Sequence, residues 1–92
     1  GGDEDNINRN IRAVDSAYQV RPNDGYINVT AAVSLTLMNN PRIGKPYWFK
    51  NASGGSVVIE GGQKTIDGLA TLTSSTAEVI KLVYNGLEFE RW

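Results

Sequence analysis

The chain has 92 residues, contains neither cysteine nor histidine, and carries nine basic against ten acidic side chains. A chain of this length forms one domain and buries only about 60 to 65% of the surface that its unfolded form exposes, so contact with a partner subunit would add useful burial. The composition excludes disulfides, thiolate zinc sites and histidine-based nucleophilic catalysis, and the balanced charge gives no sign of binding to nucleic acid or an anionic membrane.

The N-terminal segment, residues 1–10, is expected to be a flexible arm or a linker from a preceding region, because it opens with the polar run "GGDEDN". The start at Gly1-Gly2, without methionine or a basic leader, is interpreted as a fragment or processed end. No cofactor or metal is expected. The longest apolar stretch, "TAAVSLTLM", is far shorter than the ~20 residues that span a bilayer.

Two interpretations remain open for residues 7–18. Four apolar side chains there have the a/d spacing of a coiled coil, which would fit the stub of a fibre shaft: Ile7, Ile11, Val14 and Tyr18. The three asparagines of "NINRN" disfavour a helix, and "IRAV" followed by "SAYQV" also fits two extended segments with a turn at Asp15. We prefer strand over helix for this segment.

Residues 11–92 are expected to form a single all-β domain, because apolar and polar residues alternate with period two almost throughout. Side chains two positions apart are expected to share the buried face in each strand: Tyr18 and Val20; Ile27 and Val29; Val33, Leu35 and Leu37; Tyr47 and Phe49; Val57 and Ile59; Ile80, Leu82 and Tyr84. The expected architecture is a small antiparallel β-sandwich or barrel-like domain of short strands, assembled as a trimer.

The segments between these strands are rich in glycine and Asx residues, which favour tight turns. Asn85-Gly86 gives the sharpest signal, because a type I′ turn needs positive φ at both central residues, and we expect a terminal hairpin there. The glycines expected to define turns of the fold are Gly25, Gly55, Gly62, Gly68 and Gly86.

The glycine-rich stretch "NASGGSVVIEGGQKT" has neither the spacing of a P-loop nor that of a dinucleotide fingerprint, so we interpret Gly54-Gly55 and Gly61-Gly62 as turns. Glu88 and Glu90 lie two apart on the expected last strand, the arrangement of an acid–base pair. A solvated edge strand explains that spacing more simply.

Three aromatic residues are the candidate contact residues: Trp48, Trp92 and Tyr26. Trp48 is expected to point away from its neighbours Tyr47 and Phe49, which leaves it without a place inside the monomer. The preferred role is packing against another subunit, and stacking on a glycan is the alternative.

From "SAYQV" onward the chain resembles the small β-domain found in bacteriophage tail fibres, tailspikes and other virion appendages, often at the C-terminus. The resemblance covers about residues 12–92 and rests on the order and spacing of several motifs. These are Tyr18-x-Val20, Asp24-Gly25-x-Ile27, the alternating Val33, Leu35 and Leu37, Gly44-Lys45 before Tyr47-x-Phe49-Lys50-Asn51, Val57-x-Ile59, Gln63-x-Thr65-Ile66-Asp67-Gly68, Ile80-x-Leu82-Val83, and Asn85-Gly86 before Phe89.

The resemblance implies a non-enzymatic module on the surface of a phage particle, trimeric or seated on a trimeric body, that serves in assembly and in attachment to a host glycan or protein. The alternative is a head-decoration or head-fibre protein that binds the capsid through its N-terminal arm. A third hypothesis, a domain of a polysaccharide-degrading tailspike with Glu88 and Glu90 as acid and base, is less favoured. No nucleic acid and no membrane insertion are expected.

Overall fold

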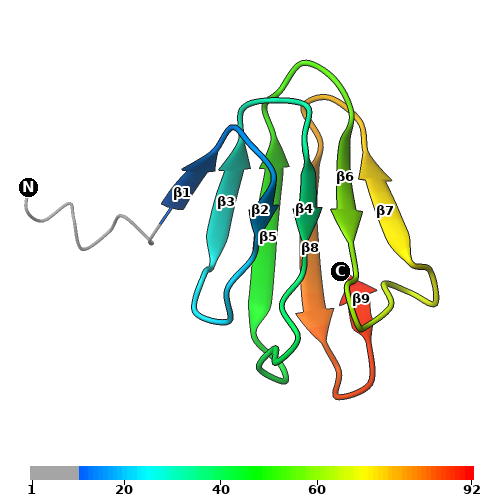
Figure 1. Cartoon of the computed structure of the whole chain (residues 1–92). Coiled ribbons are helices and arrows are strands. Elements are labelled where there is room, and N and C mark those ends of the chain that lie inside the picture. The colour runs from blue at the N-terminus through cyan, green and yellow to red at the C-terminus, as the bar shows by residue number, and fades with distance from the viewer. Residues whose placement is uncertain (1–10) are drawn as a thin grey trace, which may run out of the picture.

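A computed structural model describes residues 11–92, and in this range the chain is all-β, with nine strands and no helix. The strands form a five-stranded sheet in the order β1-β3-β5-β8-β9 and a four-stranded sheet in the order β2-β4-β6-β7 (Figure 1). Their bounds are β1 (Ile11–Val14), β2 (Tyr18–Gln19), β3 (Tyr26–Val29), β4 (Ser34–Thr36), β5 (Pro46–Asn51), β6 (Val57–Glu60), β7 (Thr71–Ser74), β8 (Val79–Tyr84) and β9 (Phe89–Arg91).

The first six strands alternate between the two sheets, so that each strand and the one after it lie in different layers (Figure 1). Consequently β1, β3 and β5 are parallel neighbours in one sheet, and β2, β4 and β6 are parallel neighbours in the other. The prediction of an antiparallel domain is therefore wrong for this half of the chain: both sheets are mixed. The short connections cross between layers and do not form hairpins, so Gly54-Gly55 joins β5 to a strand of the opposite sheet.

The last three strands are antiparallel to their neighbours: β7 pairs with β6, β8 with β5, and β9 with β8. The free edge of β9 is covered by the β6–β7 connection, where the Phe89 amide donates to the Thr65 carbonyl (2.9 Å) and the Asp67 amide donates to the Phe89 carbonyl (2.8 Å). Ile66, between them, is buried. This arrangement closes one side of the molecule and protects an edge that would otherwise invite pairing with another chain.

The predicted terminal hairpin is confirmed, since Tyr84 pairs with Phe89 across β8 and β9. The prediction of a type I′ turn is wrong, because residues 85–88 form a longer loop and Asn85 does not have a positive φ. The Asn85 side-chain carbonyl accepts hydrogen bonds from the amides of Leu87 (2.8 Å) and Glu88 (2.9 Å), so the asparagine closes the loop with its side chain.

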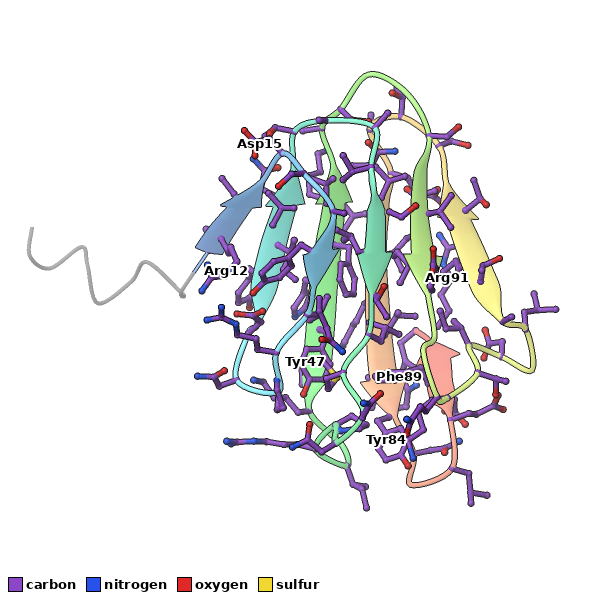
Figure 2. The ribbon with its side chains drawn as sticks, viewed as in Figure 1. Arg12, Asp15, Tyr47, Tyr84, Phe89 and Arg91 are labelled. Carbon is purple, nitrogen blue, oxygen red and sulfur yellow. The ribbon has the colours of Figure 1, made fainter. Side chains whose placement is uncertain are left out.

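The core between the two sheets contains the side chains that period-two alternation predicted, together with Val14, Met38, Ile66 and Phe89, which it did not predict. Ile27, Val29, Leu35, Leu37, Tyr47, Phe49, Val57, Ile59, Ile80, Leu82 and Tyr84 are all buried, and Tyr18 and Val33 pack against them while partly exposed. Tyr47, Tyr84 and Phe89 gather at the end of the molecule that carries the β8–β9 loop (Figure 2). Phe89 makes an edge contact with Tyr47 (centroids 6.3 Å apart) and a tilted one with Tyr84 (5.3 Å).

Among the five glycines predicted to define turns, three have positive φ: Gly62, Gly68 and Gly86. Gly25 and Gly55 have ordinary backbone angles, and an added methyl group would meet nothing at Gly25 and only an ordinary contact with Ala32 at Gly55, so the backbone does not demand glycine there. Gly61, which the sequence placed in a turn with Gly62 but not among these five, has the strictest requirement for glycine: a methyl group there would collide with the carbonyl of Lys64.

The preference for strand over helix in residues 7–18 is confirmed for the part that the structure describes, because Ile11–Val14 forms β1 and Tyr18–Gln19 forms β2. The remainder of that segment, and the predicted arm over residues 1–10, lie outside the described residues. No helix long and apolar enough to cross a membrane occurs in the described part of the chain.

Candidate functional site

The three aromatic residues singled out from the sequence lie on one surface, the outer face of the five-stranded sheet. Strand pairing places Tyr26 beside Trp48 and Trp48 beside Lys81. Trp92, the residue directly after β9, lies on the other side of Lys81, because its amide donates to the Lys81 carbonyl (2.8 Å). Ile11 on β1 is paired with Tyr26 and borders this line of side chains. The aromatic row, defined as Tyr26, Trp48, Lys81 and Trp92, therefore crosses β3, β5 and β8 to the chain end.

Trp48 is enclosed from within the chain, which corrects the prediction that it has no place in the monomer. The Tyr26 ring stacks on it with centroids 5.9 Å apart and planes 9° from parallel. The Lys81 ammonium lies 4.8 Å from the centroid of the Trp48 ring and 5.7 Å from that of Trp92. Such contacts contribute about 0.5–1 kcal/mol each at exposed sites. Trp48 is half-buried as a result, whereas Trp92 remains 71% exposed.

Lys81 is the member of the row that sequence reasoning missed. Its position between Ile80 and Leu82 predicts an outward side chain by alternation. Its place beside Trp48 and Trp92, however, depends on the register of β8 against β5 and β9, and a single sequence contains no statement of that register.

A hollow of about 320 Å³ lies next to the row. Its lining residues come from β5, β8, β9, the loops at the ends of β5 and β8, and the C-terminus: Ile43, Gly44, Pro46, Lys81, Val83, Tyr84, Asn85, Glu90 and Trp92. The volume is at the lower end of the ~300–1,000 Å³ range of small-ligand pockets. The walls are mostly apolar, and the charged groups of Lys81 and Glu90 lie at the site.

The exposed hydrophobic side chains of the described residues concentrate on this side of the molecule. Seven large ones are exposed, and five of them belong to the outer face of the five-stranded sheet or to the hollow: Ile11, Tyr26, Ile43, Val79 and Trp92. The outer face of the four-stranded sheet instead carries small polar side chains, Ser34, Thr36, Thr71 and Thr73 among them. Clustered exposed apolar surface is typical of a binding face.

The two glutamates considered as an acid–base pair contact different segments. Glu88 precedes β9 and accepts hydrogen bonds from the Thr65 hydroxyl (2.7 Å) and the Gly68 amide (2.6 Å). Glu90 accepts from the Asn85 side-chain amide (2.7 Å) and the Trp92 indole (3.2 Å). Each carboxylate is thus engaged in holding a loop or the chain end. Among residues 11–92 no group of three acidic, histidine or cysteine side chains is arranged to hold a metal ion.

A polar cluster that the sequence did not reveal lies between the β1 and β2 edges of the two sheets. Asp24, which is buried, accepts hydrogen bonds from the Tyr18 hydroxyl (2.6 Å) and the Arg21 amide (2.9 Å) and pairs with Arg12 (3.4 Å). Burial raises the pKa of Asp24, but these hydrogen bonds and the charge of Arg12 outweigh it and hold the pKa below its usual value. The cluster caps this end of the core, where β1 and β2 have no further strand beside them among the described residues.

No family model matches the chain. A search of curated proteins likewise finds no match. The candidate site therefore stands on its geometry: an aromatic row, a cation and an apolar hollow on one face of the sheet.

Proposed function

We propose that the chain is a non-enzymatic surface module of a bacteriophage particle, a tail-fibre or tailspike domain that assembles as a trimer and attaches to the host surface. The observation that carries the proposal is the aromatic row with its adjoining hollow, because exposed indole rings on a rigid sheet are suited to contact a glycan or a protein. The ordered motifs over residues 12–92 that resemble virion appendage domains, and the all-β fold, support it.

Three copies around a symmetry axis would present the aromatic row three times, which converts weak individual contacts into avidity. Trimerisation also adds buried surface to a chain too short to bury much of its own. We expect sedimentation equilibrium at micromolar concentration to give three times the 10.0 kDa mass of the chain. A compact monomer under these conditions would count against the trimer.

Attachment is tested by measuring how the labelled protein binds to a panel of bacterial strains and, separately, to empty phage heads. We expect binding to cells, weakened about tenfold or more by Trp92→Ala, since stacking on an aromatic ring contributes on the order of 1–2 kcal/mol at each copy. Leu87→Ala is the matched control, because Leu87 is also exposed (85%) but lies in the β8–β9 loop and does not line the hollow.

The same comparison separates the proposal from its alternative. Binding to phage heads without binding to cells favours the head-decoration or head-fibre protein. Binding to cells that Trp92→Ala and Leu87→Ala reduce equally rejects the aromatic row as the contact surface. Release of sugar from bound polysaccharide, lost in a double variant Glu88→Gln, Glu90→Gln, would replace the non-enzymatic proposal with a catalytic one.

A further inference from the structure

We propose that the hollow beside Trp92 binds a sugar residue that carries a carboxylate, within a linear acidic glycan that lies along the aromatic row. The proposal rests on the attachment function proposed above and specifies the class of ligand. It is carried by three features of this face: the shape and lining of the hollow, the surroundings of the Lys81 ammonium, and the way Glu90 is engaged.

The hollow has the lining that a pyranose ring requires. Pro46 and Val83 are cross-strand partners on the outer face, and Ile43, 73% exposed, extends from the preceding loop, so an aliphatic wall stands beside the Trp92 indole. A pyranose presents an apolar face of C–H groups and a rim of hydroxyls. An aromatic platform with a small number of polar groups around it matches both parts.

The Lys81 ammonium supplies the preference for a negative charge. It lies over two indole rings, which hold the cation in place without neutralising it. No carboxylate of residues 11–92 lies within ion-pair distance, and none of the hydrogen bonds among these residues uses its three donors. An ammonium of this kind is a point-charge donor for a carboxylate. Lys50 lies on the same face one row away, so the face has a positive excess in a chain of net charge −1.

Glu90 keeps its negative charge at the hollow, but it forms no ion pair with Lys81, because its oxygens face two neutral donors. One accepts from the Asn85 side-chain amide (2.7 Å) and the other from the Trp92 indole nitrogen (3.2 Å). Glu90 therefore acts as a positioning residue that orients the Trp92 ring at the edge of the hollow. It also ties that ring to the β8–β9 loop, which fixes the platform before a ligand arrives.

The row is long enough for more than one sugar. Neighbouring strands lie ~4.8 Å apart, and β8 separates β5 from the end of the chain beyond β9, so Trp48 and Trp92 lie about 10 Å apart across the sheet. Lys81 stands between these two platforms. A linear oligosaccharide laid across the strands would stack on the exposed Trp92 ring, pass over the outer edge of Trp48, whose faces are taken by Tyr26 and Lys81, and place the carboxylate of one sugar at Lys81.

The test uses tetragalacturonate and a sialic acid tetramer as probes, each compared with its methyl ester, in which the rings are kept and the charge is removed. Binding to the 92-residue chain is followed by tryptophan fluorescence at low salt and at 0.5 M salt. We expect at least one acid to bind about tenfold more tightly than its ester, because a charge-assisted hydrogen bond is lost in the ester. The preference should weaken in salt.

Three variants locate the effect. Lys81→Gln should bind the acid and its ester with equal affinity, whereas Lys50→Gln should still bind the acid more tightly. Trp92→Ala should lower the affinity for both acid and ester. Thermal unfolding of each variant shows whether the fold is kept. Equal affinity of the wild type for acid and ester with both probes, or an acid preference that survives Lys81→Gln, overturns the proposal.

Adhesion to cells, measured in parallel with the same variants, separates this proposal from the attachment function. If adhesion is lost in Trp92→Ala but unchanged in Lys81→Gln, the attachment function stands and the proposal of an acidic ligand is rejected. Binding of an acid probe that depends on Lys81, without adhesion to any strain, supports the site and counts against attachment.

Discussion

Replacing Asn51 by alanine is expected to lower the free energy of unfolding by about 2–4 kcal/mol, a large effect for a polar residue at the end of a strand. Asn51 ends β5 and is buried. Its side-chain amide nitrogen lies within hydrogen-bond distance of three backbone carbonyls, those of Gly55 (2.8 Å), Ser74 (3.1 Å) and Ser75 (2.9 Å). Alanine removes a donor that these three carbonyls share, and the bond to the Ser74 carbonyl is the one that lies in a buried place, where a lost hydrogen bond costs most.

The other end of the same amide organises the β5–β6 connection. The Asn51 side-chain oxygen accepts from the Ser53 amide (3.0 Å) and from its hydroxyl (2.6 Å). One side chain therefore joins two connections that pass between the sheets, residues 52–56 and the turn after Ser74, which meet at the same end of the molecule (Figure 1). Its loss should loosen both connections together.

Asn28→Ala provides the matched control, since it makes the same chemical change on β3 of the same sheet but on the outer face, beside Lys50. Urea unfolding followed by tryptophan fluorescence measures both variants. Asn51→Asp adds a second comparison, because it keeps the acceptor and removes the donor, and we expect it to lose most of the stability that alanine loses. Equal stability of Asn51→Ala and Asn28→Ala would contradict the assigned role.

The buried faces of the strands could be predicted from the sequence because burial acts locally, on alternate residues. Tyr47 and Phe49, for example, point inward and Trp48 outward, as period two requires. The order of the strands in each sheet, by contrast, depends on contacts between segments far apart in the sequence. A short polar run such as "NASGGS" fits a hairpin turn and a crossing between two layers equally well, and only the packing of the whole chain selects the crossing.

The candidate site divides in the same way. Trp48, Trp92 and Tyr26 were recognisable because a large aromatic residue at an outward position is itself a signal. Lys81 gave no such signal, because an outward lysine on a strand is ordinary until the register brings two indoles to it. The Asp24 cluster was hidden for a different reason: "PNDG" predicts a turn and nothing in it indicates that the carboxylate is buried.

The two outer faces of the fold carry different kinds of side chain. Parallel pairing of β3 with β5 sets Tyr26 and Trp48 side by side on neighbouring strands, and antiparallel pairing of β8 with β5 brings Lys81 to the same row. The opposite face keeps small hydroxyl side chains. The sheet thus holds the aromatic groups at fixed spacing, so little conformational entropy would be lost on binding of the proposed ligand.

Acid is expected to destabilise the protein through Asp24, and Asp24→Asn should remove most of that sensitivity. The pKa of Asp24 is held below its usual value in the folded protein, so its charged form stabilises the fold at any pH above the unfolded value of about 3.9. That contribution is lost as the pH falls through the folded pKa. At pH 7, Asp24→Asn should therefore cost about 1.5–3 kcal/mol, the range for hydrogen bonds to a charged group.

The measurement is urea unfolding of wild type and variant at intervals from pH 7 to pH 2. The difference in unfolding free energy should shrink as the pH falls below about 4, because the protonated wild-type carboxyl then resembles the amide of the variant. Asp15→Asn is the control: Asp15 is an exposed aspartate in the β1–β2 connection (Figure 2), and its replacement should leave stability nearly unchanged at every pH. A constant difference between wild type and Asp24→Asn from pH 7 to pH 2 would show that packing around residue 24, and not its charge, holds this end of the core closed.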